Sequence, residues 1–265
     1  MNLAVISPSY INSLRRANFA QDSLESLRAA GGRWFPHIVV DDRPRTQAQI
    51  AAAASRIYQG PNITFIQRFS HGSISALLDA LREARKQGAD LLFIHLDDCV
   101  YVPELGSLLE HARDAFEKDE ELVAVRLSDY PILSKDCTPE LGNRTRIDVG
   151  ENLVSFDRVH LQPTRHKDYT LWWAYFDDKM ADGEYWPIAM WQAVYRAEFL
   201  ERLLTHEPVA KLGSLGQVEL YYKTNWRSAS LAGKLAYINM QFAGLEMHRN
   251  RNWRELIRYS NEAVR

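Results

Sequence analysis

Two pairs of adjacent aspartates are the residues of this sequence that are best placed to do chemistry. Asp97 and Asp98 directly follow the apolar run 91–96, and Asp41 and Asp42 end a shorter apolar run. Two like charges at the end of a buried strand repel each other and are costly to remove from water. We therefore expect a cation beside Asp97 and Asp98.

The first half of the chain alternates strand and helix patterns, which brings both aspartate pairs to one edge of a sheet. The patterns predict strands at 3–6, 37–40, 63–66, 91–96 and 122–127, and helices at 17–30, 46–58, 74–87 and 105–118. This order is typical of an α/β fold with a largely parallel sheet and helices on both faces. Ligands of such sheets bind outside the carboxyl ends of the strands. The candidate binding residues at these ends are Ser7, Tyr10, Asp41, Arg68, Ser73, Asp97 and Asp98.

Two kinds of cation could neutralise Asp97 and Asp98. Mg²⁺ or Mn²⁺ prefers oxygen ligands and is often held by one or two carboxylates together with substrate phosphates. The structural alternative is an ion cluster in which Arg43, Arg45 or Arg68 pairs with the carboxylates. We favour the divalent cation, because the pair stands at the expected binding edge next to a second aspartate pair.

Several other functions are excluded by what the sequence lacks. Residues 6–10 read ISPSY, and neither G-x-G-x-x-G nor G-x-x-x-x-G-K-[ST] occurs, which argues against dinucleotide and P-loop chemistry. The net charge of −2 gives no basic excess for nucleic acid, and two cysteines are too few for a disulfide framework. Without a secretory signal or a long apolar run, we expect a cytoplasmic protein.

The second half of the chain carries weaker patterns. Residues 128–190 are rich in aromatic residues and show no clear period, so we expect irregular structure there. Strands are predicted at 191–195 and 235–240, and helices at 196–204, 217–226 and 253–263. With no repeat and no linker in the sequence, we expect a single domain over residues 1–265.

Two segments, taken together and in order, resemble the GT-A-fold glycosyltransferases, especially family 2. They are IVVDD at 38–42 and FIHLDDCVYVPEL at 93–105. In that family a strand ending in VDD holds the base and ribose of a nucleotide, and a later LDxD- or xDD-like element holds the metal and the donor diphosphate. The resemblance covers residues 3–127 well and the rest loosely. Cys99 departs from it, because many members carry a third acidic residue at this position.

The resemblance implies a role for each residue at the strand ends. Asp41 would contact the base or the ribose, Asp97 the ribose or the donor sugar, and Asp98 the Mn²⁺ or Mg²⁺ ion. Ser7 and Tyr10 would lie near the nucleobase, by position only. The nucleotide-sugar-binding half would then be residues 1–127 and the acceptor-binding half residues 128–265.

Further phosphate ligands are expected from three other places. Arg68 and the turn before Ser73 would approach the donor phosphates, because a helix begins there and helix N-termini favour anions. His248 stands where many family members have a late histidine that reaches the metal or the diphosphate, and Arg249 beside it could bind phosphate.

A carboxylate base is implied for an inverting mechanism, and Glu219 is our candidate. Family members often show E-D-x-x-L in this region, and aligning it on Leu220 places Gln217 where an acid is expected, with Glu219 nearby. Asp177, Asp178 and Glu207 are its rivals. The plain alternative for Glu219 is a solvated residue on a helix.

The sequence therefore predicts a metal-dependent glycosyltransferase that uses a nucleotide-diphosphate sugar, with a UDP-sugar favoured from the resemblance alone. Its acceptor would be a glycan or a lipid-linked saccharide, and tryptophans between 172 and 191 could form a sugar platform or a small core. The arginine-rich segment 249–265 packs on the domain or contacts a membrane surface peripherally. The alternatives are a non-catalytic module that binds nucleotide or glycan, and a sugar nucleotidyltransferase.

Overall fold

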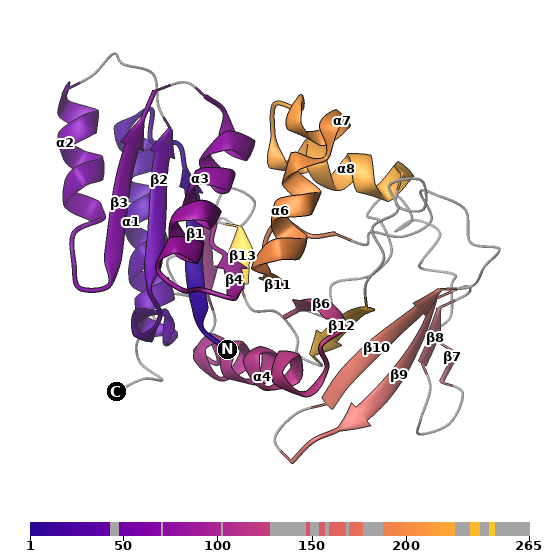
Figure 1. The fold of residues 1–265 in the computed structure, drawn as a ribbon. Coiled ribbons are helices and arrows are strands. Elements are labelled where there is room, and N and C mark those ends of the chain that lie inside the picture. The colour runs from indigo at the N-terminus through magenta and orange to yellow at the C-terminus, as the bar shows by residue number, and fades with distance from the viewer. Residues whose placement is uncertain are drawn as a thin grey trace.

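The computed structural model describes residues 1–42, 48–69, 71–101, 103–127, 147–148, 154–156, 159–167, 170–176, 188–225, 234–238 and 244–246. Strands and helices alternate along the first half of the chain (Figure 1). These elements are β1 (Leu3–Ser9), α1 (Leu14–Ala29), the 3₁₀ turn η1 (Gly32–Trp34), β2 (His37–Asp42), α2 (Ala48–Ile57), β3 (Ile63–Arg68), α3 (Ser73–Lys86), β4 (Leu91–Ile94), β5 (Cys99–Tyr101), α4 (Leu105–Lys118) and β6 (Leu122–Arg126).

The second half begins with strands where we expected irregular structure, and that expectation was wrong for residues 147–148, 154–156, 159–165 and 170–176. These strands form an antiparallel meander: β7 (Ile147–Asp148), β8 (Val154–Phe156), β9 (Val159–Arg165) and β10 (Thr170–Phe176). The elements that follow are β11 (Ala193–Arg196), α6 (Ala197–Thr205), α7 (Glu207–Ala210), α8 (Leu215–Asn225), β12 (Lys234–Ile238) and β13 (Gly244–Glu246). No described helix combines the length and the hydropathy that crossing a membrane requires.

One sheet connects the two halves of the chain. Its strand order is β3-β2-β1-β4-β11-β6-β12-β10-β9-β8-β7. The strands β3, β2, β1 and β4 are parallel, whereas β11 runs antiparallel to both of its neighbours, β4 and β6. The prediction of a largely parallel α/β sheet is confirmed, since β6 and β12 share the direction of β4 and only β11 interrupts them before the meander.

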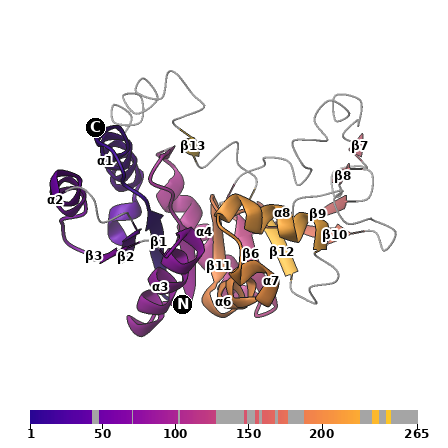
Figure 2. The same cartoon turned by 90° about the horizontal axis from the view of Figure 1, so that it is seen from above.

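Alternate residues of each central strand belong to opposite cores. Leu3 and Val5 of β1 pack with α1, α2 and α4, whereas Ala4 and Ile6 pack with α3, α6 and α8. This alternation follows from the two-residue period of a strand, and fully apolar strands are what a sheet covered on both faces requires. Figure 2 shows β1 and β11 from above, between α1 on one side and α3 and α6 on the other.

A small second sheet brings a late segment of the chain to the binding edge. Strand β13 pairs antiparallel with β5, and Glu246 lies opposite Cys99, the residue that follows the aspartate pair. The Cys99 side chain is buried in the core that α1 covers. The position where family members carry a third acid therefore faces the protein interior here.

Candidate functional site

Asp97 and Asp98 lie directly beyond the carboxyl end of β4, as the sequence predicted, and protein groups hold Asp97 in place. One oxygen of Asp97, Oδ2, accepts hydrogen bonds from the Ser9 hydroxyl at 3.0 Å and from the Tyr10 backbone N–H at 3.1 Å. The other, Oδ1, lies 2.5 Å from a guanidinium nitrogen of Arg16. Only 3% of Asp97 is exposed. This carboxylate is thus fixed before any ligand arrives.

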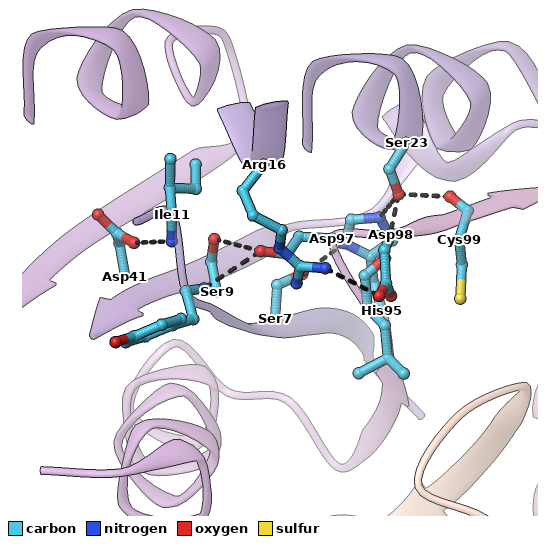
Figure 3. A network of polar contacts seen from close by, with 12 residues as sticks. Ser7, Ser9, Ile11, Arg16, Ser23, Asp41, His95, Asp97, Asp98 and Cys99 are labelled. Atoms are coloured by element: carbon cyan, nitrogen blue, oxygen red, sulfur yellow. Dashed lines mark hydrogen bonds and ion pairs between the residues drawn. The ribbon is translucent and has the colours of Figure 1, made fainter. Parts of the chain in front are cut away.

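Among the described residues, Arg16 is a cation that contacts both aspartates. One guanidinium nitrogen contacts Asp97 and the other contacts Asp98 Oδ2 at 2.9 Å, so a single side chain bridges both carboxylates (Figure 3). The arginines predicted for this role were Arg43, Arg45 and Arg68, and the prediction did not include Arg16. Arg43 and Arg45 lie outside the described residues.

Burial and charge act in opposite directions on this cluster. Burial raises the pKa of Asp97, and the guanidinium of Arg16 offsets this effect only in part. Burial alone would lower the pKa of Arg16, but the charges of Asp97 and Asp98 outweigh it and raise that pKa. The site therefore holds a permanent positive charge on Arg16 and a carboxylate that is costly to leave unneutralised.

A chain of buried polar side chains lies beneath the aspartate pair. His37 Nε2 is 2.6 Å from Ser7 Oγ, Ser7 Oγ is 2.7 Å from His95 Nδ1, and His95 Nε2 is 2.9 Å from Ser23 Oγ. All four residues are buried. Because Ser7 uses its hydroxyl inside the sheet, it supports the site from below rather than facing a nucleobase.

The direction of each hydrogen bond in this chain follows from Ser23. The Ser23 hydroxyl donates its one proton to a backbone carbonyl, such as that of Cys99, so His95 must donate to Ser23 through Nε2–H. His95 stays neutral, because burial lowers its pKa to about 3. Its Nδ1 therefore accepts from Ser7, and Ser7 accepts from His37 Nε2–H. This ordered chain ties the turn that carries the aspartates to β1, β2 and α1.

The earlier aspartate pair is also held by backbone groups. Asp41 is buried, and its Oδ1 accepts the Ile11 N–H at 3.3 Å. Asp42 accepts the His71 N–H at 3.0 Å and the Gly72 N–H at 2.5 Å. Gly72 has φ of 90°, a conformation that a side chain would strain. Asp42 thus holds the turn that starts α3, and its carboxylate occupies N–H groups that a phosphate could have used.

Arg68 and Ser73 lie at the expected strand end and helix start, but they differ in what they contact. The Arg68 guanidinium donates to the Ser75 carbonyl at 3.0 Å and to the Ser75 hydroxyl at 2.8 Å, and it forms an ion pair with Asp79. It is therefore committed to α3. The Ser73 hydroxyl is buried and has no hydrogen-bond partner among the described residues.

Glu219 belongs to the same sheet edge as the aspartate pair. Its Oε1 accepts the Met190 backbone N–H at 2.5 Å, in the segment just before β11. The first residue of β11, Ala193, pairs with Arg126 at the end of β6. Because β11 runs antiparallel to β4 and β6, its start lies where those strands end, at the edge that carries Asp97.

Sequence analysis missed Gln192 in this segment. It has φ of 51°, which is uncommon outside glycine, and it is buried between Met190 and β11. Backbone strain of this kind clusters at functional sites, where the surrounding structure must maintain it. No pattern in the sequence indicated this conformation.

The rival candidates for the base, and Gln217 at the position where an acid was expected, contact surface groups or lie outside the described residues. Gln217 accepts the Gly213 N–H at 2.7 Å and helps to start α8. Glu207 pairs with Lys211 at 2.7 Å on the surface. Asp177 and Asp178 lie outside the described residues, as do the two late ligand candidates, His248 and Arg249.

The donor set at the aspartate pair fits Mn²⁺ or Mg²⁺ in type. Two adjacent carboxylates supply hard oxygen ligands, and substrate phosphates ordinarily complete such a site. Within the described ranges, no group of three or more His, Cys, Asp or Glu side chains could hold a metal ion without such help. The oxygens that would bind the ion also contact Arg16.

Comparison with known proteins identifies the class of fold. No family model and no curated protein matches this sequence. Among solved structures, S. aureus TarS matches 98% of this chain at 14% identity with a TM-score of 0.52. TarS residues 1–349 in complex with UDP-GlcNAc match 98% of it at 12% identity with a TM-score of 0.50.

A third structure bears the name of another class of enzyme. It is described as a glucose-1-phosphate thymidylyltransferase from Bacillus anthracis in complex with sucrose, and it matches 98% of this chain at 11% identity with a TM-score of 0.50. Our chain covers 96% of that protein, but 65% of TarS 1–349 and 39% of the longer TarS chain. At these identities the likenesses show the fold, which is GT-A-like, as the sequence predicted.

Proposed function

We propose that this protein is a glycosyltransferase that moves a sugar from a nucleotide-diphosphate sugar to a saccharide acceptor. The observation that carries this proposal is the pre-positioned pair Asp97 and Asp98 at the carboxyl end of β4 in a GT-A-like sheet. A UDP-sugar is the favoured donor, since the family that the sequence resembles uses such donors and TarS was solved with UDP-GlcNAc.

In this proposal residues 1–127 hold the donor. Asp41 and Tyr10 contact the base and ribose, Asp97 contacts the ribose or the sugar, and Asp98 is a ligand of Mn²⁺ or Mg²⁺. When bound, such an ion stabilises the negative charge that builds on the leaving diphosphate. Ser73 is a further candidate to bind the donor phosphates, because its buried hydroxyl at the start of α3 has no hydrogen-bond partner among the described residues.

Residues 128–265 hold the acceptor, a glycan or a lipid-linked saccharide. Glu219 takes the proton from the acceptor hydroxyl, which attacks the anomeric carbon and inverts its configuration. Its support is the contact with Met190, which lies at the same sheet edge as Asp97. His248 and Arg249 stay proposed as metal and phosphate ligands, and the strand before them, β13, pairs with β5 directly after the aspartate turn.

A sugar nucleotidyltransferase is the second candidate, because the thymidylyltransferase from Bacillus anthracis is matched over 96% of its length. That reading predicts a glycine-rich basic loop after the first strand. The segment between β1 and α1 contains no glycine, and Arg16 beyond it faces the aspartates instead of open solvent. We therefore rank the glycosyltransferase first.

Thermal unfolding against UDP, GDP, dTDP and CMP, each with Mn²⁺ and again with EDTA, tests the proposal. A ligand at a hundredfold excess over its Kd adds about 2.7 kcal/mol of stability, and each kcal/mol raises Tm by about 2–4 °C. We expect a metal-dependent rise with one nucleoside diphosphate that is lost in Asp98→Asn. No rise with any nucleotide would overturn the proposal.

An assay of products separates the two enzyme classes. A glycosyltransferase releases the nucleoside diphosphate from a UDP-sugar when an acceptor is added. A nucleotidyltransferase instead releases pyrophosphate from a nucleoside triphosphate and a sugar phosphate. Nucleotide binding without either release would identify a non-catalytic module.

A further inference from the structure

We propose that Arg16 and a divalent cation compete for the same two carboxylates, so that the metal binds well only together with the nucleoside diphosphate. This inference rests on the proposed function, because it takes Asp97 and Asp98 to be the place where a metal and a nucleotide meet. It adds a residue and an order of binding that neither the sequence nor the fold indicates.

Arg16 contacts one oxygen of each carboxylate, and a metal ion that bridges Asp97 and Asp98 would need at least one oxygen that a protein donor already uses. The two terminal nitrogens of Arg16 contact Asp97 Oδ1 at 2.5 Å and Asp98 Oδ2 at 2.9 Å (Figure 3). Asp97 Oδ2 is already used by Ser9 and Tyr10. A metal ion that binds one oxygen of each aspartate must therefore take an Asp97 oxygen that a protein donor already uses, and at Oδ1 it meets the guanidinium.

The balance of charge around the two carboxylates determines when the Arg16 guanidinium gives up its contacts with them. With Arg16 in place, its guanidinium offsets part of the negative charge of the two carboxylates, which weakens their attraction for a divalent ion. The ion also repels the guanidinium, which loses its partners in exchange. A nucleoside diphosphate changes this balance, because its phosphates are new acceptors for the metal and for the released guanidinium.

The position of Arg16 in α1 indicates that the carboxylates hold it there. Arg16 lies in the first turn of α1, which contains no acidic residue, and the positive end of the helix dipole disfavours a cation there. Its neighbour Arg15 lies in the same turn but is exposed, and its guanidinium lies over the Phe19 ring at 5.4 Å. Arg15 is therefore a matched control of the same residue type.

Mn²⁺ binding measured from the electron paramagnetic resonance signal of free Mn²⁺ tests the competition without any assay of activity. The full chain and its variants Arg16→Gln and Arg15→Gln are titrated with Mn²⁺ alone and then with Mn²⁺ and UDP. Without UDP we expect Arg16→Gln to bind Mn²⁺ about tenfold more tightly than the parent, a factor that corresponds to roughly 1.4 kcal/mol. Arg15→Gln should match the parent.

Linkage adds a second expected result. If Arg16 must leave before the metal binds, UDP should tighten Mn²⁺ binding to the parent by a larger factor than to Arg16→Gln. Equal Mn²⁺ affinity of Arg16→Gln and the parent would overturn the inference. So would a gain of similar size in Arg15→Gln, because that result would be a general effect of surface charge.

Two further results keep the test decisive. If Arg16→Gln does not fold, Arg16→Lys replaces it, since one ammonium keeps the charge but lacks the planar fork that bridges two carboxylates. Arg16→Lys should then bind Mn²⁺ more tightly than the parent, and unchanged affinity would overturn the competition. If Mn²⁺ binding behaves as expected but none of UDP, GDP, dTDP and CMP binds, the competition stands and the proposed function fails.

Discussion

The two halves of the sheet hold their candidate residues in different ways. On the proposed donor side, Asp97 and Asp42 are fixed by backbone N–H groups and short side chains at the ends of parallel strands. On the proposed acceptor side, Glu219 comes from a helix and reaches the backbone just before the antiparallel strand β11. The first group of carboxylates is held rigidly by the sheet, whereas the candidate base comes to the same edge from another layer.

The largest expected effect is the loss of catalytic rate when Glu219 is substituted. We expect Glu219→Gln to lower the rate of sugar transfer by about a hundredfold to ten-thousandfold, because it removes the proposed general base and leaves the proposed donor site intact. The measurement is steady-state transfer from a UDP-sugar, together with UDP binding, which should not change.

Glu207→Gln is the matched control for Glu219→Gln, since Glu207 pairs with Lys211 on the surface. It should transfer sugar at the rate of the parent. If Glu219→Gln keeps full transfer activity, Glu219 is not the base, and another residue must take that role.

An effect of intermediate size is expected in the pH dependence of stability. It tests whether the buried His37–Ser7–His95 chain stays neutral beneath the aspartate pair. Burial lowers the pKa of His37 well below its ordinary value, and the neighbouring His95 ring and the positive charge of Arg28 lower it further. Below about pH 6.5, His37 therefore binds a proton in the unfolded chain but stays neutral in the folded protein. Stability present above this pH is lost as the pH falls, by about 1.4 kcal/mol per pH unit for this one histidine.

His37→Gln isolates that contribution, because an amide can still donate to Ser7 but does not titrate. We expect the free energy of unfolding in urea to fall less steeply between pH 6.5 and 4.5 in the variant than in the parent, by about one proton. Equal slopes would mean that His37 does not stay neutral in the fold.

The smallest expected effect concerns Arg68, which the sequence assigned to the donor phosphates. Because its guanidinium is committed to Ser75 and Asp79, we expect Arg68→Gln to cost about 1 kcal/mol of stability. UDP affinity should change less than about threefold. Asp79→Asn should cost a similar amount, and the double variant should cost less than the sum. A tenfold loss of UDP affinity in Arg68→Gln would return this arginine to the phosphate site.

Local patterns account for most of what could be predicted on the donor side. Apolar runs and helical leucine spacing marked β1 to β4 and α3, because strands covered on both faces must be continuously apolar. The first helix begins earlier than predicted, since Ser13 accepts the Arg16 N–H and caps it at Leu14.

Long-range partners account for most of what was missed. Arg16 and Asp97 are separated by 81 residues, and the sequence around neither residue indicates that they are in contact. The one signal was a pair of arginines in a first helical turn without an acid, where a cation needs a partner elsewhere. In β9, Val159 and Leu161 alternate with polar residues, but Pro163 interrupts the pattern and hid the strand.

The place of β11 in the sheet has a consequence for the order in which the chain can fold. Strands β4 and β6 are complete by residue 126, but the strand that joins them is formed by residues 193–196. A growing chain therefore holds two apolar strand edges open until that later segment is made. Such edges pair readily with other chains, so this stage of synthesis exposes the protein to aggregation.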